Sequence, residues 1–371
     1  MKTTRRRFAT GLIGLAVLLP AAAACGDDPA PAILESGKPF VVEGETIATQ
    51  ELVDAAVKEG TLTLYTGLNE VTTRAVNEAF TADTGIKVEF VRSPSSRLFE
   101  RVKSELGAGN LPADIVAIGD PSLVTDLDNS GLYAQYKVPM DGDLEAQYKS
   151  KNGTYYSFSN LANVFAYNTE VFKGTPPQSW ADLANLDGTA NRLGMVQAGA
   201  SAGGWRLAYF MRQELSNGSD SYWRKIAATK PLIDTSTGSL TEKLSRGEIA
   251  IALARPPEVA GAQKDGAPLK IVWPSDGSPI ISAYAGVTAK APHPNAAKLY
   301  LSWLLSKRGQ SKLAAEGGDY AIRTDAAPPQ LNGQAAPPLA DIKAKFAPDA
   351  DQIAKRDGWL KEWGTVFGIA G

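Results

Sequence analysis

The sequence predicts an α/β protein in which mostly parallel sheets are covered by helices. From residue 50 onward, short apolar segments alternate with amphipathic helical segments, as in repeated βα units. The length of 371 residues favours two globular domains, or one large one. The composition, 44% hydrophobic and 21% charged, is that of a folded, water-soluble protein and excludes a disordered chain or a multi-span membrane protein.

Charge and residue usage exclude several function classes. The 38 basic and 40 acidic residues nearly balance, which leaves no basic surface for a nucleic acid. One Cys and one His exclude a disulfide framework and a Cys/His zinc cluster. We therefore expect no metal, no cofactor and no nucleic-acid partner.

Residues 1–25 have the pattern of a secretion signal. Arg5, Arg6 and Arg7 precede an apolar run over 11–19, which is too short to span a membrane. Residues 4–8 (TRRRF) resemble the twin-arginine export pattern, with general secretion as the alternative.

The end of this signal predicts a lipid anchor. Residues 22–25 (AAAC) resemble the bacterial lipobox, with Ala22 at a position usually held by Leu, and this predicts lipidation of Cys25. The alternative is cleavage at the alanines with an unmodified thiol. The Pro-containing polar stretch 26–49 is expected to be a flexible tether. The protein is then exported and held by lipid, in the periplasm or at the outer face of the cytoplasmic membrane.

Two series of strands and helices follow. Gly60, Gly85 and Gly107 mark helix ends in the first series. Its expected elements are a helix at 51–58, a strand at 61–65, a helix at 72–84, a strand at 87–91, a helix at 97–106 and a strand at 114–118. In the second series we expect extended chain at 159–167 and strands at 192–197, 248–254 and 281–289. Its expected helices start at 180 and cover 202–215, 239–245 and 294–305. The amphipathic stretch at 339–367 is interpreted as a helix that packs on the protein.

Eight short segments, in fixed order and spacing, carry a resemblance to a known family. They are 64–67 (LYTG), 75–80 (AVNEAF), 84–88 (TGIKV), 98–105 (LFERVKSE), 112–115 (PADI), 165–169 (FAYNT), 247–250 (GEIA) and 291–297 (APHPNAA). Together they resemble the extracellular solute-binding proteins of ABC importers, family 1, in the ferric-iron/thiamine/phosphonate-like branch. The resemblance covers about residues 50 to 325.

The resemblance implies a type II periplasmic-binding-protein fold. Two α/β lobes would be joined by strands that cross near 156–165 and 279–285, and the last helices would close over both lobes. Lobe 1 would hold 50–157 and 280–315, and lobe 2 would hold 158–279 and 316–371. The implied function is capture of a small solute by hinge closure and its delivery to an ABC permease, with the protein expected to act as a monomer and not as an enzyme.

Loops beyond the carboxyl ends of the strands supply the candidate ligand contacts, because open α/β sheets bind ligands there. Ser95 and Ser96, Ser201, and Ser239 stand at predicted helix starts, where unpaired N–H groups favour an anion, although plain capping is the alternative. Ser239 with Glu242 fits a capping box. The contacts expected in these loops are Tyr65, Thr66, Asn69, Ser93, Ser95, Ser96, Arg97, Asp120, Ser201 and Trp205.

Arg255 is the strongest single candidate. It follows the apolar strand 249–254, so its guanidinium would reach the cleft. There it could bind a carboxylate or phosphate through two parallel hydrogen bonds. The alternative is a structural ion pair with an acid such as Glu258. Tyr65, Trp205 and Tyr284 are expected to wall the ligand, with packing inside a lobe as their alternative.

One departure from the family argues against bare ferric iron. Ferric-binding relatives carry two adjacent tyrosines after the strand that here ends at Ala254, and this chain has Pro256 and Pro257 there. His293 lies in a loop far from the expected site, and Tyr155–Tyr156 would face opposite ways on a strand. We therefore expect an anionic ligand. The alternative is a ferric ion or ferric complex held by nonstandard ligands. A ligand-sensing surface protein and an exported enzyme are more distant alternatives, the latter because no G-x-S-x-G elbow occurs.

Overall fold

The structure, a computed structural model, describes residues 34–369. The predicted signal peptide and the candidate lipidation site Cys25 lie outside these residues. Within them, no helix has the length and apolar character needed to cross a membrane.

The first lobe is built on a five-stranded sheet with the order β4-β3-β5-β12-β6. β3 is parallel to β4 and β5, and β12 runs antiparallel to β5 and β6. The strands are β3 (Thr61–Thr66), β4 (Lys87–Arg92), β5 (Ile115–Ile118), β6 (Tyr156–Ala162) and β12 (Ile280–Val287). The helices are α1 (Gln50–Glu59), α2 (Glu70–Thr84), α3 (Ser95–Gly107), α4 (Pro121–Asn129), α10 (Pro294–Leu305) and α11 (Lys307–Ala315).

The second lobe has its own five-stranded sheet, with the order β11-β7-β10-β8-β9. β8 is parallel to β9 and β10, whereas β7 is antiparallel to β10 and β11. The strands are β7 (Val164–Asn168), β8 (Leu193–Val196), β9 (Leu232–Asp234), β10 (Ile251–Ala254) and β11 (Leu269–Val272). The helices are α5 (Trp180–Leu183), α6 (Ala202–Gln213), α7 (Ser221–Ala228), α8 (Thr237–Ser245) and α9 (Pro256–Lys264).

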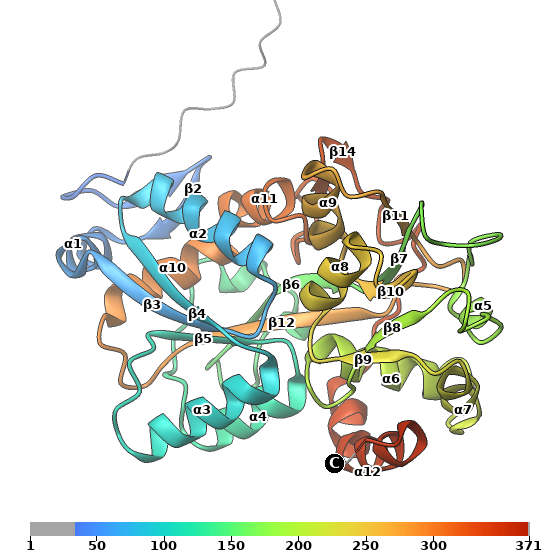
Figure 1. Cartoon of the computed structure of the whole chain (residues 1–371). Helices are drawn as coiled ribbons and strands as arrows, with labels where there is room; N and C mark the ends of the chain where they lie inside the picture. The colour runs from blue at the N-terminus through green and yellow to red at the C-terminus, as the bar shows by residue number, and fades with distance from the viewer. Residues whose placement is uncertain (1–33, 370–371) are drawn as a thin grey trace, which may run out of the picture.

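The chain passes between the sheets at two adjacent places (Figure 1). β6 belongs to the first sheet and β7 to the second, so that Asn163 is the crossing residue. The return strand β12 starts beside it, because Ile280 pairs with Ala162. The lobe boundary expected between residues 157 and 158 therefore falls inside β6, a strand of the first sheet.

The last helix, α12 (Asp349–Phe367), contacts both lobes and not the second alone. It packs on α6 and α7 of the second lobe and on α4 of the first, below the crossing strands in Figure 1. The Arg356 Nε donates to Asp120 Oδ2 at 3.0 Å, and the Tyr284 hydroxyl donates to Asp349 Oδ2 at 2.6 Å. These polar contacts fix the start and middle of α12 to the first lobe. A small strand pair, β13 (Gln330–Leu331) with β14 (Gln334–Ala335), lies in the segment before α12.

Residues 34–48 form folded structure where the sequence predicted a flexible tether. β1 (Phe40–Val42) and β2 (Glu45–Ala48) make a hairpin, and Phe40 and Ile47 are buried in the core of the first lobe. The Glu45 carboxylate accepts bonds from the Lys307 backbone N–H at 2.7 Å and from Arg323 Nη1 at 2.8 Å. The tether prediction rested on the prolines and polar residues of the segment, and the two partners of Glu45 lie more than 250 residues away.

Two substitutions in this hairpin should differ in their effect on the free energy of unfolding. Ile47→Ala removes a fully buried side chain and should lower the free energy of unfolding by about 2–5 kcal/mol. Val41→Ala, on the same hairpin, should change it by less than about 0.5 kcal/mol because Val41 is 47% exposed. Urea unfolding followed by tryptophan fluorescence measures both. Equal midpoints for the two variants would show that the hairpin is not part of the first core.

Candidate ligand-binding site

A narrow cavity of about 50 Å³ lies between the two lobes, next to the crossing strands. Leu161 of β6 and Ile281 of β12 form its wall at the hinge, and the other lining residues come from loops and helix starts on both sides. The first lobe contributes Gly67, Leu68, Asn69, Arg92 and Pro94, and the second contributes Ser201, Ala202, Gly203, Ser236, Thr237, Arg255 and Glu258. A wider groove between α2 and the helices α8 and α9 shares Arg92, Ser236 and Glu258 with it.

Five helices begin at this cavity, and the N-cap residue of each one lines it. They are Asn69 for α2, Pro94 for α3, Ser201 for α6, Ser236 for α8 and Arg255 for α9. Each helix follows a strand that takes part in parallel pairing: β3, β4, β8, β9 and β10, in that order. A parallel βα connection places the helix start at the carboxyl edge of its sheet. Because the two carboxyl edges face the same space, both lobes deliver their helix starts to it.

This arrangement creates a positive backbone potential inside the cavity. A helix N-terminus carries roughly half a positive charge and N–H groups without intrahelical partners. Side chains of three N-caps each accept one such bond: Asn69 from the Thr72 N–H at 2.8 Å, Ser201 from Gly204 at 3.1 Å and Ser236 from Ser239 at 3.2 Å. Within residues 34–369, no side chain caps α3. α9 starts with Pro256 and Pro257, which have no N–H, and so contributes its dipole alone.

Several buried polar atoms of the lining have no hydrogen-bond partner among the described residues. They include Asn69 Nδ2, Arg255 Nε and Glu258 Oε2. Buried polar groups are nearly always hydrogen-bonded in folded proteins, and each exception points to strain or to a missing partner. Three residues that carry such an atom therefore belong to the lining of one cavity.

The two cations of the lining come from opposite lobes. Arg92, at the end of β4, is half-buried and donates from Nε to the Leu68 carbonyl at 3.1 Å. Arg255 is buried and donates from Nη2 to Asp319 Oδ1 at 2.9 Å. Burial raises the pKa of Asp319, and Arg255 opposes this shift. The structural ion pair expected as an alternative for Arg255 therefore exists, but with Asp319 and not with Glu258.

Glu258 is the carboxylate of the lining. It lies in the first turn of α9 and is 8% exposed. The Thr237 hydroxyl donates to its Oε1 at 3.0 Å. Burial raises the pKa of Glu258 to about 6, although Arg255, the Thr237 hydroxyl and Arg92 all act to lower it.

Comparison with known proteins decides the family. The model of the family described as "Bacterial extracellular solute-binding protein" matches residues 75–341, which is more than half of the chain. The chain belongs to this family. The solute-binding protein therefore has the role predicted from the sequence, binding a solute for an ABC importer, and it is an exported protein. Its family consists of transport proteins and not of enzymes.

Relatives and solved structures agree with this assignment. The chain is 27% identical over 285 residues to the putative 2-aminoethylphosphonate-binding periplasmic protein of Salmonella typhi, covering 75% of this chain and 82% of that one. It is 23% identical over 325 residues to the Fe(3+)-binding periplasmic protein of Serratia marcescens, covering 85% and 92%. The fold matches AfuA from Actinobacillus pleuropneumoniae with fructose-6-phosphate bound, at a TM-score of 0.69, 20% identity and coverage of 84% and 99%. The predicted two-lobed fold is confirmed.

The aromatic candidates of this solute-binding protein pack inside the lobes. The Tyr65 hydroxyl bonds with Arg101 Nη2 at 2.7 Å, and Tyr284 bonds with Asp349 in the same core cluster. Trp205 is buried against Tyr209 and Trp359, with ring centroids at 6.0 and 6.5 Å. All three make packing contacts, and Trp205 and Tyr284 also line a small cavity of about 20 Å³ at the start of α12.

The remaining polar candidates are distributed over three places. Asn69, Ser201 and Arg255 line the cavity. Thr66 and Asp120 are buried: the Thr66 hydroxyl accepts from the Leu68 N–H at 3.1 Å, and Asp120 caps α4 and accepts from Arg356 of α12.

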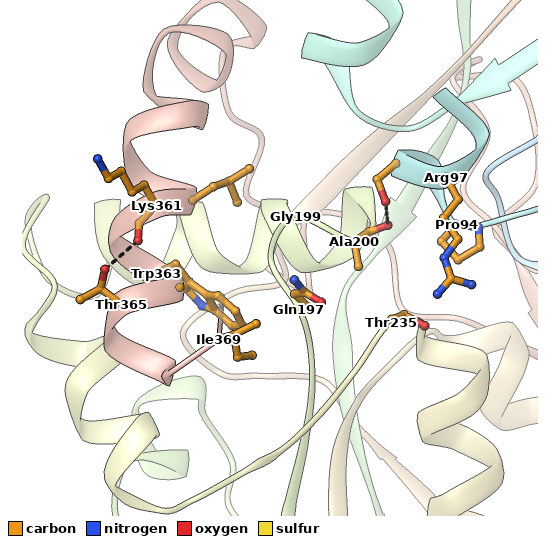
Figure 2. Close-up of a pocket in the computed structure, with 13 residues that line it drawn as sticks. Pro94, Arg97, Gln197, Gly199, Ala200, Thr235, Lys361, Trp363, Thr365 and Ile369 are labelled. Carbon is orange, nitrogen blue, oxygen red and sulfur yellow. Dashed lines mark hydrogen bonds between the residues drawn. The ribbon is translucent and has the colours of Figure 1, made fainter. Parts of the chain in front are cut away.

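Ser96 and Arg97 line a second cavity of about 700 Å³ between α3 and α12, with Arg97 extending toward Thr235 (Figure 2). The Ser96 hydroxyl donates to the Ala200 carbonyl at 3.2 Å, which joins the two lobes. In the same loop Ser93 is half-buried, and Ser95 is buried with a hydroxyl that has no partner in the described chain.

Sequence reasoning missed part of the cavity. The predicted capping box at Ser239 is wrong: Ser236 caps α8, and the Ser239 hydroxyl donates to Asp234 Oδ2 at 2.8 Å. Four polar residues stand in a row at 234–237, and the cap could not be chosen among them without the helix geometry. Glu258 entered only as an ion-pair partner, because its burial depends on how α8 and α9 pack.

The residues considered for iron lie away from the cavity. The Tyr156 hydroxyl donates to Asp141 Oδ1 at 3.0 Å, and Tyr155 packs edge-on against Tyr284. His293 Nδ1 lies 3.0 Å from Asp114 Oδ2. The part of the chain described, 34–369, contains no group of three or more His, Cys, Asp or Glu side chains able to hold a metal ion.

The raised pKa of Glu258 predicts a pH-dependent cost to folding. Between its unfolded value of 4.5 and about 6, the folded protein binds more protons than the unfolded chain, so the free energy of unfolding falls as pH rises. Glu258→Gln should therefore gain about 2 kcal/mol relative to the unsubstituted protein between pH 4 and pH 8. Urea unfolding without added solute at both pH values measures the change. A stability difference that is the same at both pH values would show that Glu258 titrates normally.

Proposed function

We propose that this solute-binding protein captures a small anionic solute in the cavity between its lobes. The observation that supports it is the convergence of five helix starts, two from the first lobe and three from the second, on one narrow space. N–H groups and helix dipoles there favour a negative charge without needing a cationic side chain. Arg92 adds a full positive charge on the side of the first lobe.

Closure of the hinge would couple binding to transport. A solute held by helix starts of both lobes binds the closed form better than the open form and shifts the population toward it. A change from mostly open to mostly closed requires about 5 kcal/mol of difference in binding free energy. The two lobes already touch beside the crossing strands, where a Cβ on Gly119 of the first lobe would lie 3.0 Å from Ala202 Cβ of the second. The closed form would then be the one delivered to the permease.

An anion accounts for the cavity better than a bare ferric ion does. Of the described residues that line the cavity, none is tyrosine, and Pro256 and Pro257 stand where ferric-binding relatives are expected to carry two adjacent tyrosines. One similar protein is named for 2-aminoethylphosphonate, and the similar structure of AfuA has fructose-6-phosphate bound. A cavity of about 50 Å³ favours a group the size of a phosphonate or a small carboxylate.

We further propose that the exported protein is a monomer anchored through lipid on Cys25. The alanines before Cys25 and the lack of any other cysteine in the sequence support the lipid anchor. Cys25→Ser should move the protein from the membrane fraction to the soluble fraction without changing its melting temperature, which fractionation and calorimetry measure. Membrane retention of the variant would contradict the lipid anchor.

The anion site predicts a difference between two equivalent glycines. Gly203 and Gly238 each hold the second position of their helix, α6 and α8, but of the two only Gly203 lines the cavity. A Cβ on Gly203 would meet Asn163 Oδ1 at 3.5 Å and Ile281 Cδ1 at 3.7 Å, which the fold accommodates. Gly203→Ala should therefore keep its stability and lose at least tenfold in solute affinity, about 1.4 kcal/mol. Gly238→Ala should keep both its stability and its affinity for the solute.

The measurement is a thermal-shift screen followed by calorimetry. The panel contains phosphate, alkylphosphonates, short dicarboxylates, spermidine and ferric citrate. Anions should raise the melting temperature through linkage, and Gly203→Ala should reduce the shift. Stabilisation by spermidine alone, or a visible charge-transfer band with iron that Gly203→Ala leaves unchanged, would contradict the proposed anion site.

A further inference from the structure

The last helix, α12, is bound to the second lobe by aromatic rings and charges, and it lies beside α6 and α7 (Figure 1). The Trp359 ring centroid lies 6.5 Å from that of Trp205 on α6 and 6.3 Å from that of Trp223 on α7. The Arg212 guanidinium carbon lies 4.4 Å from the Trp359 centroid, and Arg212 Nη1 donates to Glu362 Oε2 at 2.5 Å. These contacts make α12 part of the rigid body of the second lobe.

One charged side chain of the same helix reaches the first lobe. Arg356 Nε donates to Asp120 Oδ2 at 3.0 Å, and the two side chains are 14% and 2% exposed. Asp120 follows β5 of the first sheet and caps α4, where its Oδ1 accepts from the Ser122 N–H at 2.9 Å. The Asp120 carboxylate therefore joins the first lobe to a helix of the second, and we call Arg356 with Asp120 the interlobe ion pair.

Opening of the hinge would separate the two charges of this pair. When the lobes part, α12 cannot follow both of them, and its aromatic contacts hold it to the second. The bond between Tyr284 and Asp349 at the start of α12 is made on β12, the strand that itself returns between the lobes. The interlobe ion pair, by contrast, ends at the start of α4, which moves with the first lobe.

The interlobe ion pair lies outside the solute cavity. Neither Arg356 nor Asp120 is among the described residues that line it. Arg255 also takes part in a buried ion pair, but Arg255 lines the cavity. A further contact between the lobes, from the Ser96 hydroxyl to the Ala200 carbonyl at 3.2 Å, is neutral. The interlobe ion pair is thus a charged contact that can act on closure without touching the solute.

We propose that the interlobe ion pair stabilises the closed form, so that Arg356 is a positioning residue that controls solute affinity from outside the cavity. This inference rests on the hinge closure of the proposed function, but not on the identity of the solute. Inside one lobe, a charge that loses its partner stays buried, whereas between lobes opening returns that charge to water. Loss of Arg356 would therefore favour the open form. Because the apparent affinity scales with the closed fraction, every solute should lose affinity by the same factor.

Arg356→Gln tests this inference, with Arg308→Gln as the matched control. Arg308 donates to Asp83 from Nε at 2.9 Å and from Nη2 at 2.8 Å, and these side chains are similarly buried, at 11% and 1% exposed. This pair joins α11 to α2 inside the first lobe. Calorimetry with two anions that raise the melting temperature should show at least a fivefold loss of affinity in Arg356→Gln, equal for both anions within about twofold. Arg308→Gln should lower the melting temperature and keep both affinities within about twofold.

The distance between the lobes is measured without solute. Glu78→Cys on α2 and Glu242→Cys on α8 place spin labels at exposed positions that line the wide groove from different lobes. Cys25→Ser removes the sole native cysteine, so that the labels attach at these two positions alone. In this background, Arg356→Gln should lengthen the mean distance between the labels, and Arg308→Gln should leave it unchanged. Far-UV circular dichroism verifies that both variants are folded.

Arg356→Lys is the second variant and keeps the positive charge. It should recover part of the affinity and of the shorter distance that Arg356→Gln loses. Unchanged distances and affinities in Arg356→Gln would overturn the inference, and so would a loss of affinity for one anion alone, which would place Arg356 in contact with the solute. Failure of every anion to bind would contradict the proposed function, while the solute-free distances would still test the ion pair.

Discussion

The structure depends on one constraint: five strands of two sheets end at the same narrow space and each is followed by a helix that starts there. Parallel pairing makes the arrangement unavoidable, since it aligns strand ends, and the crossing at Asn163 turns the two aligned edges toward each other. The backbone alone then supplies a positive potential at the base of the cleft. Side chains refine this potential: among the lining residues, Arg92 strengthens it and Glu258 opposes it.

The charged residues divide into those that hold the lobes and those that face the cavity. Arg255 with Asp319 and Arg356 with Asp120 are largely buried ion pairs, and the latter ties α12 to the first lobe. Removing one partner of such a pair leaves an uncompensated buried charge and costs about 3–5 kcal/mol. A loss of binding in an Arg255 variant would therefore report on the fold as much as on the ligand. For this reason, the backbone positions and Glu258 are better probes of the solute.

Much of the fold could be predicted from the sequence, because its βα units are local patterns. The helix expected over 97–106 spans Ser95–Gly107, and the strand expected over 61–65 spans Thr61–Thr66. The hairpin at 40–48 was missed since Phe40 and Ile47 have no local partner and are buried only against the first core. In the cavity, Asn69, Ser201 and Arg255 could be located from strand ends. The aromatics Tyr65, Trp205 and Tyr284 could not be placed, because their sequence context does not show toward which side of a sheet they point.

A crystal structure grown with the anion that most raises the melting temperature tests the central claim most directly. The account predicts anion oxygens within hydrogen-bond distance of first-turn N–H groups from both lobes, in the cavity lined by Asn69, Gly203 and Ser236. An anion bound instead in the larger cavity beside α12, or against one lobe only, would contradict it.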